Sequence, residues 1–109
     1  MKKLLFLCGK NKLRSPTAEE IFSKWEDLEV LSAGVSNDAQ VLVDSEMILW
    51  ADIIFVMEKV HKSKLSKKFQ KFLKGKKVIC LDIPDEYEYM SPELVEILER
   101  KVLPLLKLH

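Results

Sequence analysis

The chain has 109 residues, which is close to the most common length of a single domain and leaves no room for a separate substrate domain. We therefore expect one domain over residues 1–109. Hydrophobic residues make up 48% and charged residues 32%, a balance that excludes a disordered or low-complexity chain. The net charge of +1 selects neither nucleic acid nor membrane as a partner, and the first apolar run is too short for a signal peptide. These features predict a cytoplasmic protein with neither partner.

Short apolar runs alternate with amphipathic segments along the chain. The runs at residues 3–7, 29–34, 52–57 and 77–81 are typical of buried strands. Helices are expected over residues 16–26, over a short segment ending at 50, in the stretch that Gly75 ends, and after Ser91. The pattern predicts an α/β fold, a small three-layer α/β/α arrangement with a four-stranded parallel sheet. In such sheets, ligands bind beyond the carboxyl ends of the strands.

The segment after the first predicted strand carries the strongest chemical signal. Residues 8–16 read CGKNKLRSP, in which five residues separate Cys8 from Arg14 and a Ser-Pro pair opens a helix. A loop of this length at a helix N-terminus directs its N–H groups inward and forms a nest for a tetrahedral oxyanion. The Arg14 guanidinium can hold two phosphate oxygens, and the positive surroundings favour a Cys8 thiolate that attacks phosphorus. The expected phosphate-binding residues are Gly9, Lys10, Asn11, Lys12, Leu13, Arg14 and Ser15.

Two polar residues of this loop have expected supporting roles. Ser15 can donate a hydrogen bond to the Cys8 sulfur and help it leave later. Asn11 can tie the loop together through its amide or adopt a left-handed backbone. The alternative for Cys8 is a small buried hydrophobic residue, and this is also the interpretation that we favour for Cys80 inside its apolar strand.

The sequence resembles the low-molecular-weight protein tyrosine phosphatases, in particular their short bacterial-type members. The resemblance rests on residues 8–19, continues in 32–34 and 51–58, and covers most of the chain in order. It implies a Cys8 nucleophile, phosphate binding by Arg14 and the loop amides, and a thiolate supported by Ser15. The chain departs from the family pattern at Lys10 and Leu13, where the family usually has Gly and a second Cys. It also lacks a segment between strands two and three that forms part of the family's substrate wall.

The resemblance further implies a general acid in a late Asp-Pro loop, and here the sequence offers two candidates. Neither Asp82 nor Asp85 directly precedes a proline. We favour Asp82 because it stands at the carboxyl end of the fourth predicted strand, with Asp85 as the alternative. Tyr87 and Tyr89 follow and can either flank an aryl substrate or cover the edge of the core.

These observations predict a cysteine-dependent phosphomonoester hydrolase of the protein tyrosine phosphatase type, acting through a cysteinyl-phosphate without a cofactor. The expected partners are a phosphorylated protein or a small aryl phosphomonoester, with inorganic phosphate or sulfate binding in the loop. The alternatives are a non-catalytic phosphate-binding or regulatory module and, ranked lower, an arsenate reductase, which needs two further redox cysteines. His61 has no convincing ligand neighbours in sequence, so no metal is expected. The nine lysines of residues 59–77 are interpreted as a solvated face.

Overall fold

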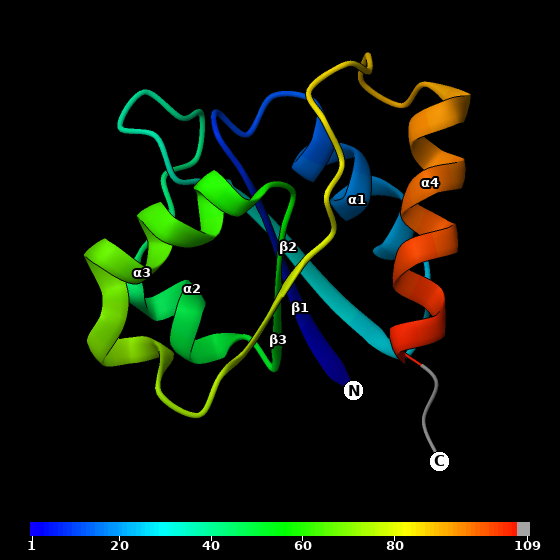
Figure 1. The fold of residues 1–109 in the computed structure, drawn as a ribbon. Coiled ribbons are helices and arrows are strands. Elements are labelled where there is room, and N and C mark those ends of the chain that lie inside the picture. Colours follow the sequence, from blue (N-terminus) through cyan, green and yellow to red (C-terminus); the bar gives the residue numbers. More distant parts are fainter. Residues whose placement is uncertain (107–109) are drawn as a thin grey trace.

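The computed structural model describes residues 1–106, which form a parallel sheet covered by helices on both faces (Figure 1). The strand order is β2-β1-β3-β4, and every neighbouring pair is parallel. This arrangement confirms the predicted α/β fold with four parallel strands. In chain order the elements are β1 (Lys2–Cys8), α1 (Arg14–Phe22), β2 (Leu28–Gly34), α2 (Ser45–Trp50), β3 (Ile53–Val56), α3 (Lys59–Leu73), β4 (Lys77–Cys80), α4 (Pro92–Val102) and a 3-10 helix, Leu103–Leu106.

Alternate residues of β1 supply the two hydrophobic cores. Leu4 and Phe6 face the core beneath α1 and α4, whereas Leu5 and Leu7 face the core beneath α2 and α3. The Phe6 ring stacks on Phe55 with the ring centres 4.9 Å apart. Because successive strand side chains point to opposite faces, an unbroken apolar run is what a strand buried on both sides requires. Figure 1 shows the two helix pairs on either side of the sheet.

The first helix differs from its predicted bounds. It begins at Arg14, two residues earlier than expected, and ends at Phe22, so Trp25 lies beyond it and is exposed. The N-cap position is Leu13, and no side chain caps this helix end. A Ser-Pro pair predicts Ser as the cap, but here the Ser15 hydroxyl bonds within the adjoining loop instead. The N-terminal N–H groups of α1 are therefore left without a capping side chain.

Three chain segments converge at the carboxyl end of the sheet. β1 leads into the loop at residues 9–13, β3 leads into Glu58 and α3, and the chain beyond β4 continues along the end of β3. In that continuation, Leu81 N–H donates to the Val56 carbonyl and Ile83 N–H to the Met57 carbonyl, each at 2.8 Å. None of the helices formed by residues 1–106 combines the length and apolar character that crossing a bilayer requires.

Candidate active site

The loop between β1 and α1 is fastened to the segment that follows β2. The carbonyls of Cys8, Gly9 and Lys10 accept hydrogen bonds from the N–H groups of Val35, Ser36 and Gln40, at 2.9 to 3.0 Å. Each of these bonds turns a loop carbonyl outward toward β2. The loop N–H groups are consequently free to face the other way.

Gly34, at the end of β2, permits this close approach. A Cβ atom placed there would lie 2.5 Å from the Gly9 carbonyl oxygen and 2.6 Å from the Ala39 Cβ, both well inside contact distance. Any side chain at this position would collide, because there is no space between the loop and the segment that holds it. A glycine is therefore needed at this position for the loop to hold its shape.

A row of unpaired amides lines the inside of the loop. Within residues 1–106, the backbone N–H groups of residues 10–15 donate to no acceptor of the chain. Consecutive free amides at the N-terminus of a helix form an anion-binding nest, and the helix dipole adds to their attraction. The arrangement fits a tetrahedral oxyanion such as phosphate.

A network of side-chain hydrogen bonds holds the sulfur of Cys8 at the base of the loop. Its Sγ lies 2.9 Å from the Ser15 Oγ, and Asn11 Nδ2 donates to Ser15 Oγ and to Ser32 Oγ, each at 3.0 Å. Ser32 in turn donates to Glu19, so the network joins the loop to β2 and α1. Asn11 also has a φ of 58°. Asn11 therefore both ties the loop together through its amide and adopts a left-handed backbone.

The Arg14 side chain is buried, and two hydrogen bonds hold one of its terminal nitrogens in place. Its Nη1 donates to Glu58 Oε1 and to the Ile83 carbonyl, both at 2.7 Å, and only 5% of the residue is exposed. Three elements thus position this guanidinium: α1 carries it, the start of α3 supplies the carboxylate, and the segment after β4 supplies the carbonyl. The remaining N–H groups of the planar fork are available for a ligand.

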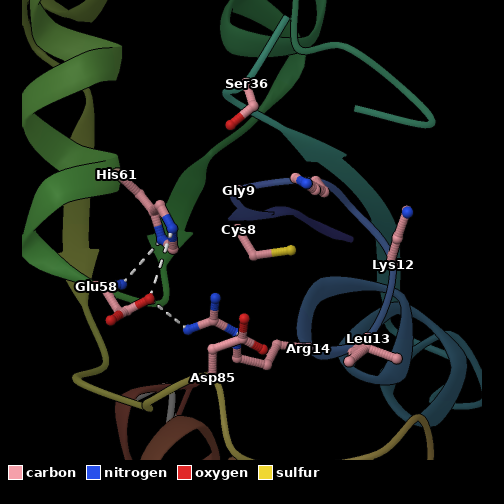
Figure 2. Close-up of a pocket in the computed structure, with 10 residues that line it drawn as sticks. Cys8, Gly9, Lys12, Leu13, Arg14, Ser36, Glu58, His61 and Asp85 are labelled. Atoms are coloured by element: carbon pink, nitrogen blue, oxygen red, sulfur yellow. Dashed lines mark hydrogen bonds and ion pairs between the residues drawn. The ribbon is translucent and has the colours of Figure 1, made fainter. Parts of the chain in front are cut away.

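These residues surround a pocket of about 300 Å³. Figure 2 shows the Cys8 sulfur in its middle, with the loop on one side and His61, Glu58 and Asp85 on the other. The lining residues are Cys8, Gly9, Lys10, Lys12, Leu13, Arg14, Ser36, Glu58, His61 and Asp85. Of the predicted phosphate-binding residues, Asn11 and Ser15 are buried behind the loop and support it without lining the pocket.

Sequence reasoning missed three lining residues, Ser36, Glu58 and His61. Glu58 is the second residue beyond β3, and His61 lies one helical turn further on, where its Nδ1 accepts the Glu58 backbone N–H at 3.1 Å. Burial, together with the nearby positive charge of Arg14, lowers the pKa of His61 below 6.5. Their position in the sequence could have identified Glu58 and His61, because polar residues just beyond a central parallel strand lie where ligands bind.

The structure brings Asp85, and not Asp82, to the pocket. Asp85 Oδ1 lies 3.8 Å from Arg14 Nε, and this carboxyl is 66% exposed at the pocket mouth. Asp82 instead lies near the Cys80 thiol, which donates to it at 3.4 Å. The reason is the pairing with β3 beyond the end of β4: Leu81 and Ile83 are both held there and buried, and Asp82 between them has a φ of 54° and is exposed.

The two tyrosines do not flank the pocket either. Tyr87 is half-buried and packs against the core beneath α1 and α4. Tyr89 is exposed and lies beside Pro16 and Glu19 on α1. The position of Tyr87 agrees with the alternative interpretation, in which such a ring covers the edge of the core, whereas Tyr89 lies on the surface and does neither. No Phe, Tyr or Trp ring lines the pocket among the residues that the structure describes.

Comparison with solved structures defines the class of fold. Wzb from Vibrio vulnificus, in complex with benzylphosphonate, superposes with a TM-score of 0.77 at 23% identity over 95% of this chain and 96% of that one. The tyrosine phosphatase Wzb from Escherichia coli K30, in complex with phosphate, gives 0.73 at 18% identity over 95% of each chain. A mutant of the arginine phosphatase YwlE with a phosphorylated active-site serine gives 0.72 at 21% identity over 96% of each.

The chain thus has the fold of the low-molecular-weight protein tyrosine phosphatases, over nearly its whole length. This finding confirms the resemblance in fold that the loop motif indicated. No protein-family model matches the sequence, and no curated protein is significantly similar to it.

Proposed function

We propose that the protein is a cysteine-dependent phosphatase of the protein tyrosine phosphatase type, which hydrolyses phosphomonoesters. The observation that carries this proposal is the Cys8 sulfur at the base of a loop whose free amides, together with Arg14, fit a phosphoryl group. The solved structures of the same fold bind phosphate and benzylphosphonate, which supports an anion in this loop.

The reaction proceeds in two displacements. In the first, the Cys8 thiolate attacks phosphorus, the S–P bond forms as the P–O bond breaks, and a carboxylic acid donates its proton to the leaving oxygen. In the second, the carboxylate takes a proton from water, the water oxygen attacks phosphorus, and the thiolate leaves with Ser15 donating to it. The loop amides and the free side of the Arg14 fork bind the three equatorial oxygens in both steps.

We assign the general acid to Asp85. It is the aspartate that lines the pocket, and its exposed carboxyl at the mouth is where a leaving group would emerge. Replacement of Asp85 by Asn should lower kcat on an alkyl phosphate by about 10²–10⁴-fold, the usual contribution of a general acid. The matched control is Asp82→Asn, which should leave kcat unchanged. If Asp82→Asn alone lowered kcat, the assignment would return to the aspartate at the strand end.

The activity itself is tested with p-nitrophenyl phosphate below neutral pH. Wild-type protein should release p-nitrophenol, Cys8→Ser should not, and Cys80→Ser should retain the activity because Cys80 lies outside the pocket. Tight phosphate binding without turnover would instead identify a phosphate-binding module. Because solved structures of this fold include both tyrosine and arginine phosphatases, phosphotyrosyl and phosphoarginyl peptides belong in the same assay.

The geometry argues against arsenate reduction by a relay between the two cysteines. Cys80 on β4 pairs in register with Val56 on β3, which in turn pairs with Leu7 on β1, so β3 lies between the two thiols. Two strand spacings separate such positions by about 10 Å. A disulfide requires Cα atoms within about 7 Å, so Cys80 cannot resolve an oxidised Cys8 without movement of the backbone.

A further inference from the structure

His61 is a buried polar side chain in the pocket wall to which the two-step reaction assigns no task. It lies in the first turn of α3, only 4% of its surface is exposed, and it lines the pocket together with Cys8 and Arg14 (Figure 2). A histidine on a packed helix face normally pairs both ring nitrogens with protein groups or with water. The partners of its two nitrogens therefore decide what this side chain can do.

The first nitrogen has a fixed partner. Nδ1 accepts the backbone N–H of Glu58 at 3.1 Å, which caps the start of α3. An accepting nitrogen carries no proton, so the neutral ring bears its proton on Nε2. Burial and the positive charge of Arg14 lower the pKa of His61 and favour this neutral form. The ring consequently presents one N–H donor in a fixed direction.

The second nitrogen has no hydrogen-bond acceptor within residues 1–106. The nearest carboxylate oxygen, Oε1 of Glu58, is 3.7 Å away and already accepts from Arg14 Nη1 at 2.7 Å. On its other side Nε2 approaches Gly9, where an added Cβ would be in van der Waals contact with it at 3.6 Å and with Ser36 Oγ at 3.8 Å, and all three residues line the pocket. The Nε2–H thus faces the pocket, and a bound ligand can supply the acceptor that the protein lacks.

The rest of this wall is polar as well. Ser36 lies across Gly9 from His61, Asp85 lies at the mouth, and neither Tyr87 nor Tyr89 lines the pocket. Such a wall offers hydrogen bonds, and within residues 1–106 it holds no Phe, Tyr or Trp ring on which an aryl group could stack. It suits a leaving group that carries an oxygen close to the ester bond.

We propose that the Nε2–H of His61 donates a hydrogen bond to an oxygen of the substrate's leaving group, so that the pocket favours phosphorylated polar alcohols over alkyl or aryl phosphates lacking such an oxygen. This inference rests on the proposed function for its biological meaning, and it concerns the same site. What it predicts is a difference in binding affinity between two kinds of phosphate ester. It can therefore be measured without turnover.

The test compares glycerol 3-phosphate with propyl phosphate, which share a primary alkyl ester and differ in the two hydroxyl groups. Their dissociation constants are measured by calorimetry on Cys8→Ser protein, which cannot turn them over. Glycerol 3-phosphate should bind about tenfold more tightly, the worth of one good hydrogen bond, and His61→Ala should abolish the difference.

Two further variants separate the hydrogen bond from the capping role of His61. Gln and Glu at this helix position both accept the Glu58 backbone N–H, but only Gln also offers an N–H to the pocket. His61→Gln should retain a preference for glycerol 3-phosphate, and His61→Glu should lose it. An equal preference in wild-type, Ala and Glu proteins would overturn the proposal, as would an equal loss of affinity for both ligands that Gln does not restore.

The same ligands distinguish failure of this inference from failure of the proposed function. If protein with an intact Cys8 hydrolyses no phosphomonoester while the preference depends on His61, the phosphatase assignment fails and the inference stands. If p-nitrophenyl phosphate is hydrolysed and the preference is absent, the inference alone fails.

Discussion

The hydroxyl of Ser15 is oriented by the groups around it. Asn11 Nδ2 donates to its oxygen at 3.0 Å, and the Ser15 hydrogen has two acceptors in reach, the Cys8 sulfur at 2.9 Å and the Ala33 carbonyl at the longer distance of 3.4 Å. A hydrogen bond to a charged group contributes about 1.5–3 kcal/mol, and Ser15 is the side chain that bonds to the Cys8 sulfur beside the unpaired amides of the loop. In the proposed mechanism, Ser15 stabilises both the attacking thiolate and the departing one.

Replacement of Ser15 by Ala should lower kcat by about 10–100-fold, because the hydrogen bond to the thiolate is lost in both steps. Rapid-mixing kinetics with p-nitrophenyl phosphate would show a burst of p-nitrophenol if the second step suffers more. Ser66→Ala, on the exposed side of α3, is the control and should behave as wild type. An unchanged kcat for Ser15→Ala would contradict the role assigned to its hydroxyl.

The buried histidine makes folding stability depend on pH. Burial first, and then Arg14, lower the pKa of His61 from 6.5, against smaller raising effects of Glu58 and Asp85; Lys64 also lowers it. Below pH 6.5 the unfolded chain therefore binds more protons at this residue than the folded chain does. As far as His61 is concerned, the free energy of unfolding should be highest above pH 6.5 and should decline as the pH falls toward the lowered pKa.

Urea unfolding of wild type and His61→Gln between pH 7.5 and pH 5 checks this dependence. The wild type should lose more stability than the variant over this range, because Gln does not titrate. Parallel curves for the two proteins would show that His61 protonates as easily in the folded state as in the unfolded one.

The sequence predicts the residues of the site that are contiguous. Cys8 and Arg14 flank one loop, so their spacing at the end of a strand and the start of a helix reveals them. Glu58 and His61 come from the end of a different strand, and only the strand order places them beside the loop. The choice of Asp85 over Asp82 depended on pairing that continues beyond β4, which the composition of the strand does not show.

At the scale of the element, the loop keeps its shape because β2 ends in a residue without a side chain. The Gly34 Cα faces the Gly9 carbonyl so closely that any Cβ would meet it at 2.5 Å. Gly75 differs, because it has a φ of +79° and nothing within 4 Å of an added Cβ. Gly34 is thus required because there is no space for a side chain, whereas Gly75 is favoured because its backbone is left-handed.

Gly34→Ala should destabilise the fold by about 1–3 kcal/mol, as overpacking does, and should abolish most phosphatase activity by displacing the loop. Gly75→Ala should cost about 1 kcal/mol from backbone strain and leave kcat/KM unchanged, because it lies at the far end of α3. Thermal unfolding and steady-state kinetics on both variants provide the comparison. Full activity in Gly34→Ala would show that the loop does not depend on this contact.

The predicted helices were correct where local chemistry alone ends or begins them. Ser91 accepts from the Leu94 N–H ahead of Pro92, Asp44 accepts from the Met47 N–H, and Gly75 follows α3. The start of α1 was wrong by two residues, because the group that would cap it is used by the Cys8 sulfur. Here the requirements of the site override the local signal.

At the scale of the whole molecule, one sheet separates two hydrophobic cores. The core under α1 and α4 includes Phe6, and the core under α2 and α3 includes Ile54. Neither core can form without the sheet that both share, since β1 and β3 contribute to each. We therefore expect the two faces to unfold together as one cooperative unit.

The two tryptophans allow this expectation to be tested. Trp25 follows α1 and Trp50 ends α2, so the single-tryptophan variants Trp50→Phe and Trp25→Phe report on opposite faces of the sheet. In each background, Phe6→Leu and Ile54→Val should each lower the free energy of unfolding by about 1 kcal/mol, with the same value from either tryptophan. Urea titrations followed by fluorescence give both values. If Phe6→Leu shifted only the Trp25 transition, the faces would unfold separately, and the single-domain interpretation would fail.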